Sequence, residues 1–151
     1  MEKTNDREIR MVKTFAAPIN IMWEAWTNPD HITNWWGPDG FTSTIHKMNI
    51  QEGGEWIMTL HSPDGTNFPN KSIFKEIIPF KKILFEHFYP HFMTTVLFTS
   101  KGEETQVDWT LLFNTAEMRE TIVIAHKADE GQKQNMEKLE KYLSTLPVNK
   151  K

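Results

Sequence analysis

The chain has 151 residues, no cysteine, and a net charge of −3 from 17 basic and 20 acidic residues. This length predicts one domain over residues 1–151, with a core large enough to need no disulfide or metal, and the missing cysteines exclude thiol catalysis and thiolate metal sites. The weakly acidic balance disfavours nucleic acid as a partner. Because neither an apolar stretch of roughly 18 residues nor an apolar leader occurs, we expect no membrane insertion and a cytoplasmic protein.

The first element expected is a strand over Glu8–Phe15, where side chains alternate in polarity. Pro18 then opens a helix. An apolar stripe at helical spacing in this helix must face the sheet, and it consists of Ile19, Met22, Trp23 and Trp26.

A second, short helix is predicted after Asn28, because asparagine caps helix starts. Gly37 and Pro38 end it, since glycine accepts the left-handed conformation past a last turn and proline cannot continue a helix. Trp35 and Trp36 are thereby placed where this helix leads into the next strand.

From Phe41 onward, glycine- and proline-containing turns separate a series of expected strands. These strands cover residues 42–50, 55–61, 70–78, 83–89, 92–100 and 105–113. Their spacing of about ten residues leaves no room for crossover helices, so neighbouring strands should pair antiparallel.

The last element expected is one long helix over Glu117–Leu143. Its apolar stripe carries two polar side chains in the middle, Asp129 and Gln132, which point toward the enclosed space if the helix lies across a concave sheet. An unpaired buried carboxylate is costly, so Asp129 should then meet a hydrogen-bond partner, a proton, solvent or a ligand. A solvated or structural role is the alternative for both residues.

Four motifs accompany this pattern: Asn28 to Phe41 with its paired tryptophans, Ala17-Pro18 with Met22-Trp23-Glu24-Ala25-Trp26, Gly53-Gly54-Glu55-Trp56, and Pro63-Asp64-Gly65. Together they resemble the SRPBCC superfamily of START-like domains, and within it the branch related to activators of the heat-shock protein 90 ATPase. The resemblance runs from about Arg7 to Leu146. It implies an α+β helix-grip fold, in which an antiparallel sheet of about six to seven strands wraps around a long C-terminal helix, with two short helices between the first two strands and a cavity inside.

Aromatic rings and a few polar groups would wall such a cavity. We predict these ligand-binding residues: Trp35, Trp36, Trp56, Phe74, Phe85, His87, Asp129 and Gln132. His87 shares a strand face with Phe85, whereas Glu86 points to the opposite face, so Glu86 and His87 cannot form an acid–base pair. Packing in a closed core is the alternative for the tryptophans and for His87.

Catalytic and cofactor motifs are absent from the sequence, and its six histidines are dispersed. We therefore predict no catalytic residue, no cofactor and no metal, and expect a binding protein with an apolar cavity for a small hydrophobic molecule. One alternative is a cyclase-like enzyme that uses Asp129, His87 or Glu86 for proton transfer.

A third reading, implied by the resemblance, is a chaperone-ATPase co-factor or a stress-response interaction protein. The activators known by that name carry an additional N-terminal domain, whereas this chain begins a few residues before its first expected strand. We therefore expect a small ligand rather than a chaperone as the partner. A homodimer is compatible with the sequence, which has no pattern that demands one.

Overall fold

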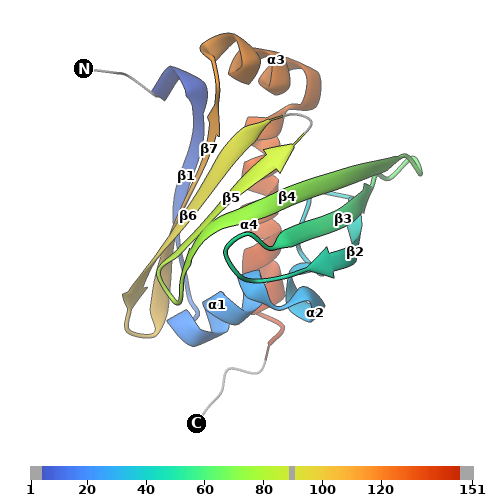
Figure 1. Ribbon diagram of the computed structural model, residues 1–151. Helices are drawn as coiled ribbons and strands as arrows, with labels where there is room; N and C mark the ends of the chain where they lie inside the picture. Colours follow the sequence, from blue (N-terminus) through green and yellow to red (C-terminus); the bar gives the residue numbers. More distant parts are fainter. Residues whose placement is uncertain (1–4, 89–90, 147–151) are drawn as a thin grey trace.

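In residues 5–88 and 91–146, which the computed structural model describes, strands of alternating polarity build one seven-stranded antiparallel sheet. The strands are β1 (Glu8–Phe15), β2 (Thr42–Met48), β3 (Glu55–His61), β4 (Asn67–Ile78), β5 (Lys82–Phe88), β6 (Phe92–Lys101) and β7 (Glu104–Phe113). The helices are the short 3-10 turn η1 (Asn5–Arg7), α1 (Ile19–Thr27), α2 (Pro29–Ile32), α3 (Ala116–His126) and α4 (Ala128–Leu143). The sheet curves around α4 (Figure 1), so the predicted α+β helix-grip fold is confirmed.

The sheet order is β1-β7-β6-β5-β4-β3-β2, so consecutive strands from β2 to β7 are neighbours, as the predicted antiparallel series requires. β1 pairs with the free side of β7, with Glu8 opposite Leu112 and Phe15 opposite Thr105. The first and last strands of the chain therefore lie side by side. Tyr89, the expected end of the strand over 83–89, lies outside the described residues.

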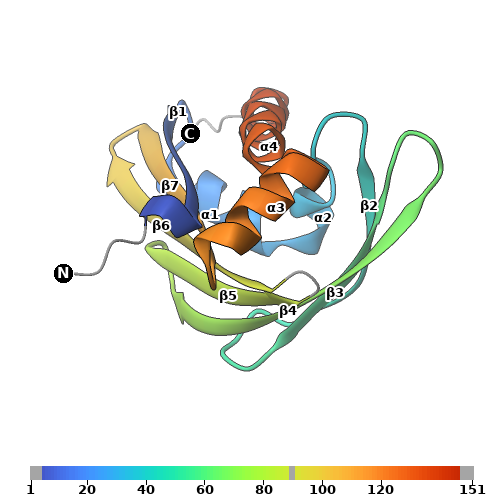
Figure 2. The same ribbon diagram turned by 90° about the horizontal axis from the view of Figure 1, so that it is seen from above.

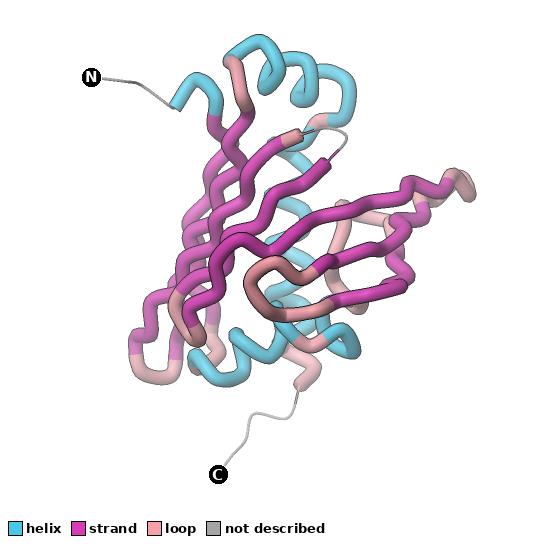
Figure 3. The backbone as a smooth tube through the Cα atoms, viewed as in Figure 1, coloured by secondary structure: helices cyan, strands magenta, loops and turns pink. Residues whose placement is uncertain are grey.

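Two register shifts help the sheet to curve. One lies between Ile45 and Lys47 in β2, and the other lies between Phe74 and Glu76 in β4. An extra residue on one strand of a pair bends that strand and increases its twist. Figure 3 shows the β3–β4 hairpin reaching away from the strands at the other edge of the sheet.

The two short helices between β1 and β2 form for the local reasons that the sequence indicates. Asn28 Oδ1 accepts a hydrogen bond from the Asp30 N–H at 2.9 Å, and Pro29 occupies the first turn of α2, where its missing donor is not needed. Gly37 follows with a φ of 108°, a conformation that side chains other than glycine rarely adopt.

An aromatic cluster fills the space between α1 and the sheet. Trp26 is buried, and its ring lies edge-on to those of Trp35 and Trp109, with centroids 4.8 and 5.5 Å away. Trp23 is only half-buried and contacts Phe98 at 5.4 Å. The stripe of α1 thus faces the sheet as predicted, with Trp26 at its centre and Trp23 at its margin.

The C-terminal helix is broken, which corrects the predicted single helix over Glu117–Leu143. Lys127 adopts a left-handed conformation with φ 50° and ψ 48°, and its N–H closes α3 by donating to Val123 O at 2.8 Å. This conformation costs a non-glycine residue roughly 1 to 2 kcal/mol, so a lysine there gives no sequence signal of a break. α4 starts along a new axis while α3 lies across the same side of the sheet (Figure 2). None of the helices in the described residues is long and apolar enough to cross a membrane.

Candidate functional site

A cavity of about 720 Å³ lies between the concave face of the sheet and the helices α3 and α4. The sheet contributes mainly aromatic and aliphatic side chains to its wall: Trp56, Met58, Leu60, Phe68, Phe85, Phe92, Trp109 and Leu111. The two helices and the segment 36–41 form the rest of its wall. Sites for small molecules in proteins typically measure roughly 300 to 1,000 Å³, so this volume suits such a ligand.

A strip of polar side chains interrupts the apolar wall. Asn70 and Ser72 on β4, His87 on β5 and Thr94 on β6 all line the cavity. Ser72 lies directly opposite His87 in the β4–β5 register. Ser72 and Thr94 are buried, whereas Asn70 and His87 are half-buried. The cavity therefore offers hydrogen-bonding groups in addition to apolar surface.

The orientation of His87 is fixed by Asn70. Asn70 Nδ2 donates to Phe68 O at 2.9 Å, which leaves Asn70 Oδ1 to accept from His87 Nε2 at 2.6 Å. Because a carboxamide oxygen only accepts, His87 Nε2 carries a proton. The imidazole also stacks on Phe92, with centroids 4.4 Å apart and ring planes 13° from parallel. Asn70 and Phe92 thus fix the orientation of the His87 ring in the cavity wall, with a proton on Nε2.

Glu86 faces away from the cavity, as strand alternation predicts. Its carboxylate accepts from His91 Nε2 at 2.7 Å and pairs with Lys75 Nζ at 3.3 Å. The hydrogen bond from His91 lowers the pKa of Glu86, with Lys75 acting in the same direction and burial opposing both. His87 and His91 therefore serve different faces of the sheet. Of the three residues considered for proton transfer, His87 lines the cavity, whereas Glu86 and Asp129 do not.

The predicted tryptophans and phenylalanines divide into two groups. Trp36, Trp56 and Phe85 line the cavity, and Trp36 contacts Trp56 with ring centroids 5.1 Å apart. Trp35 is fully buried and does not line the cavity, and its indole N–H donates to the Ala25 carbonyl at 3.0 Å. Phe74 is also buried outside the lining and stacks on Trp56. Trp35 and Phe74 thus support the wall rather than form its surface.

The two polar residues of the predicted helix stripe, Asp129 and Gln132, lie in different environments. Asp129 is exposed and outside the cavity lining, so its predicted orientation toward the enclosed space is wrong. The break at Lys127 places Asp129 in the first turn of α4, where a carboxylate complements the positive end of the helix. Gln132 is buried and lines the cavity, and its Nε2 donates to Trp109 O at 3.0 Å and to Ile9 O at 3.5 Å.

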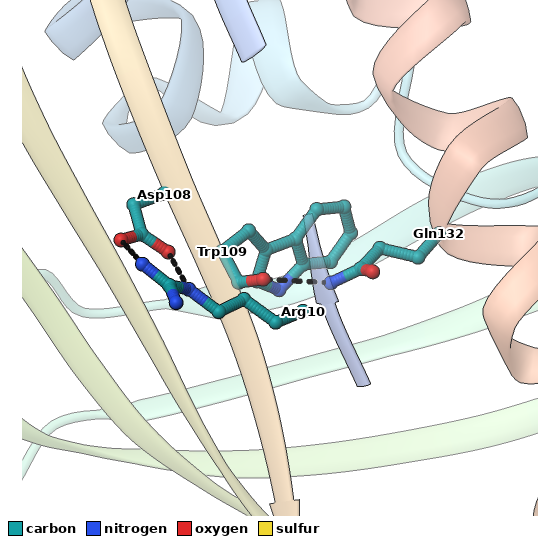
Figure 4. A network of polar contacts seen from close by, with 4 residues as sticks. All are labelled: Arg10, Asp108, Trp109 and Gln132. Carbon is teal, nitrogen blue, oxygen red and sulfur yellow. Dashed lines mark hydrogen bonds and ion pairs between the residues drawn. The ribbon is translucent and has the colours of Figure 1, made fainter. Parts of the chain in front are cut away.

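Figure 4 shows how Gln132 reaches from α4 to the backbone of β7. Beside this bond, Arg10 on β1 and Asp108 on β7 form a two-pronged ion pair at 3.0 and 2.7 Å. Arg10 and Asp108 are 98 residues apart in the sequence. Their ion pair links β1 to β7 in addition to the backbone hydrogen bonds between the two strands. α4 is fastened to the same pair of strands by the Gln132 amide.

The segment 36–41 is attached to α4 by two neighbouring side chains. The Asn135 amide is buried, and it accepts from the Gly37 N–H at 3.1 Å while donating to Trp35 O at 2.7 Å. Gln134 Oε1 accepts from the Asp39 N–H at 3.1 Å in an exposed position. These bonds hold the segment over one end of the cavity.

Lys138 completes this attachment from the next turn of α4. Its Nζ donates to the carbonyl oxygens of Pro38 at 3.2 Å and Phe41 at 3.1 Å. Burial lowers the pKa of the Lys138 ammonium, although the nearby charge of Asp39 acts in the opposite direction. Lys138 therefore helps to attach the segment 36–41 to α4.

Several residues of the site escaped the sequence-based prediction. Asn70, Ser72 and Thr94 could have been found, because each lies two or four residues from a predicted or buried inner-face residue such as Phe74. Asn135 gave no such signal, because its partner Gly37 lies 98 residues away in the sequence.

Comparison with known proteins agrees with this architecture. Residues 16–144 match the model of the family described as activator of Hsp90 ATPase homolog 1-like protein. A search of the curated proteins finds no match.

Several solved structures share the fold at low sequence identity. A protein from Arthrobacter aurescens is 19% identical, with a TM-score of 0.87, over 97% of this chain and 91% of its own. A protein from Staphylococcus epidermidis is 20% identical, with a TM-score of 0.79, over 100% and 97%. The AHSA1 protein from Silicibacter pomeroyi is 14% identical, with a TM-score of 0.74, over 91% and 97%.

Proposed function

Since the chain belongs to the family of activator of Hsp90 ATPase homolog 1-like proteins, we propose that it uses the cavity of this helix-grip domain to bind a small hydrophobic molecule. The observation that carries the proposal is the cavity of about 720 Å³ with its largely apolar wall. Removing apolar surface from water is favourable by roughly 25 cal/mol per Å², so such a wall attracts apolar ligands.

The aromatic part of the wall suits flat or elongated apolar molecules. Trp36 lies between Trp56 and Trp109, with ring centroids 5.1 and 5.5 Å from its own. Rings at these separations leave faces and edges that pack against a further ring or chain. The polar strip around His87 and Ser72 would orient the ligand within this space.

Thermal unfolding against a panel of fatty acids, isoprenoids, flavonoids and polycyclic aromatics tests the proposal. A ligand at 100 times its dissociation constant stabilises the folded state by about 2.7 kcal/mol, which corresponds to roughly 5 to 10 °C for a domain of this size. We expect a shift of that size with at least one chemical class. The absence of a shift with every class would count against a ligand-binding cavity.

A cavity-filling variant and a matched control link any shift to the cavity. Ser72→Phe adds an aromatic ring to the part of the cavity wall that β4 provides, and should abolish the ligand-induced shift in melting temperature. Lys71→Phe adds the same ring one residue earlier on β4, at an exposed position, and should leave the shift unchanged. Circular dichroism of both variants without ligand checks that they fold. Equal ligand shifts in the two folded variants would place the binding site elsewhere.

A further inference from the structure

We infer that this chain forms a symmetric dimer, in which the outer faces of two copies of the sheet meet along β6. The partner is a second copy of the chain. The inference is independent of the proposed function, because the outer face lies on the opposite side of the sheet from the cavity. It comes from an exposed row of side chains whose apolar and charged members complement the same row of another copy.

The outer face of the sheet carries exposed apolar side chains. The sheet curves around α4 and the helices lie on its concave side (Figure 2), so the outer face is convex. On this face Val12 of β1, Ile78 of β4 and Leu97 of β6 are 45%, 39% and 40% exposed. They are half of the six large apolar side chains that are exposed in the described part of the chain. Single exposed apolar residues are ordinary, whereas a group of them marks an interaction surface.

The strand register places these three residues in one row across the sheet. Each member of the row lies directly opposite the next, and the order from β4 to β1 is Ile78, Lys82, Leu97, Asp108 and Val12. The row, called the Leu97 row below, therefore reads apolar, positive, apolar, negative, apolar. Its middle member lies on β6, with two strands on either side.

The two charges of the Leu97 row are paired within the chain by residues of the next row. Lys82 Nζ lies 2.7 Å from Glu76 Oε1, and Arg10 Nη2 lies 2.7 Å from Asp108 Oδ2. Glu76 and Arg10 stand at the two ends of that next row, whose middle members are Leu84, Thr95 and Thr110. Lys82 and Asp108 remain partly exposed, so each can meet a further opposite charge.

The Leu97 row complements itself in a two-fold dimer. In such a dimer residue i of one copy contacts residue j of the other, and j contacts i. A two-fold axis that lies between the two faces and parallel to β6 reverses the order of the strands. Leu97 then meets its own copy, Lys82 meets Asp108 of the second copy, and Val12 lies on the side of Ile78 of the second copy.

The charges also distinguish between orientations of the second copy. In the next row, the same axis brings Arg10 to the side of Glu76 of the second copy, again with opposite charges. An axis across the strands through Leu97 would instead set Lys82 against Lys82 and Asp108 against Asp108. Like charges in direct opposition disfavour an interface, so the axis parallel to β6 is the one that the charges select.

The curvature of the sheet determines which contacts stabilise the dimer. Two convex faces touch along a line, so β5, β6 and β7 make the contact while β4 and β1 diverge. Leu97 buries apolar surface at the axis, and Lys82 and Asp108 lie on either side of it. Contacts of this extent belong to the class of weak interfaces below about 1,200 Å², so we expect a Kd between about 1 μM and 1 mM.

Sedimentation velocity of the full chain over a range of concentrations measures the dimer. Asp108→Lys and Lys82→Asp each oppose like charges at two symmetric contacts, so each should raise the Kd at least about 10-fold. In an equimolar mixture of the two variants, Lys82 meets Asp108 and the introduced lysine meets the introduced aspartate. The mixture should therefore form a mixed dimer with about the affinity of the unmodified chain.

Two further variants complete the experiment. Leu97→Glu leaves both ion pairs in place but sets two carboxylates against each other at the axis, so it should also raise the Kd. Lys133→Asp makes the same charge change as Lys82→Asp at an exposed position of α4, away from the outer face, and should leave the Kd unchanged. Circular dichroism verifies that each variant is folded.

Several results would overturn the inference. A monomer at every concentration up to about 1 mM would do so, as would a dimer whose Kd stays the same in Asp108→Lys, Lys82→Asp and Leu97→Glu. A mixture that stays monomeric would refute the pairing of Lys82 with Asp108. Growth beyond the dimer would indicate an open head-to-tail contact in place of the two-fold one. Ligand binding in the cavity is tested separately by the thermal panel.

Discussion

The attachment of segment 36–41 to α4 should depend mainly on one amide, that of Asn135. In Asn135→Leu the side chain keeps its branched shape and its number of heavy atoms but loses both hydrogen bonds, so the Gly37 N–H and the Trp35 carbonyl remain buried without partners. Each unsatisfied buried group costs about 1 to 3 kcal/mol. After an apolar gain of about 1 kcal/mol for the leucine is subtracted, we expect a loss of about 1 to 5 kcal/mol, a large part of the roughly 5 to 15 kcal/mol of a typical domain.

Urea unfolding followed by tryptophan fluorescence measures this loss, since the free energy in water follows from linear extrapolation. Gln134→Leu is the control, because it removes a similar bond from the same segment at an exposed site, where water replaces the amide. Its cost should stay below about 1 kcal/mol. Equal losses in the two variants, or a loss below about 0.5 kcal/mol for Asn135→Leu, would refute the role assigned to the buried amide.

Three further predictions use the same unfolding measurement. Gly131→Ala should stabilise the protein by about 0.5 to 1 kcal/mol, since alanine favours a helix interior and its Cβ would meet Pro38 no closer than 3.7 Å; a loss would indicate a hidden clash. Trp26→Ala should cost about 3 to 5 kcal/mol as a buried truncation, and a cost below about 1 kcal/mol would contradict its place in the core. Hydrogen bonds from Ser62 and Thr66 lower the pKa of Asp64 from 3.8 to about 2. The stability that Asp64 provides should therefore be complete above pH 3.8 and disappear as the pH falls toward 2; a difference from Asp64→Asn that persists below that range would contradict this.

The sheet could be predicted from the sequence because its signals are local. Turns at Gly53, Pro63 and Gly102 separate strands whose side chains alternate, and each strand pairs with the next along the chain. The break between α3 and α4 could not be predicted, because Lys127 adopts a conformation that usually selects glycine. That one residue changed the helix stripe beyond it and turned Asp129 outward.

For the site, strand alternation predicts which residues share a face of the sheet, but not which side chains form hydrogen bonds with one another. Alternation placed Glu86 and His87 on opposite faces of one strand, and His87 is the one that lines the cavity. The partner of His87 is Asn70, which lies 17 residues earlier on an adjacent strand, and residue types alone do not specify such a pairing. Gln132 illustrates the same limit, because its polar group contacts backbone carbonyls that have no sequence signature.

The position of β1 at the sheet edge has a consequence for synthesis on the ribosome. Its residues pair with β7 at separations from 90 residues, between Phe15 and Thr105, to 104 residues, between Glu8 and Leu112. At translation rates of about 5 to 20 residues per second, the nascent β1 waits roughly 5 to 20 s for its pairing partner. Its exposed backbone is a target for chaperones or for neighbouring chains during that interval. Arg119 and Gln132, which donate to the carbonyls of Glu8 and Ile9, are made later still, so a chain stalled before α3 would lack these two contacts to β1.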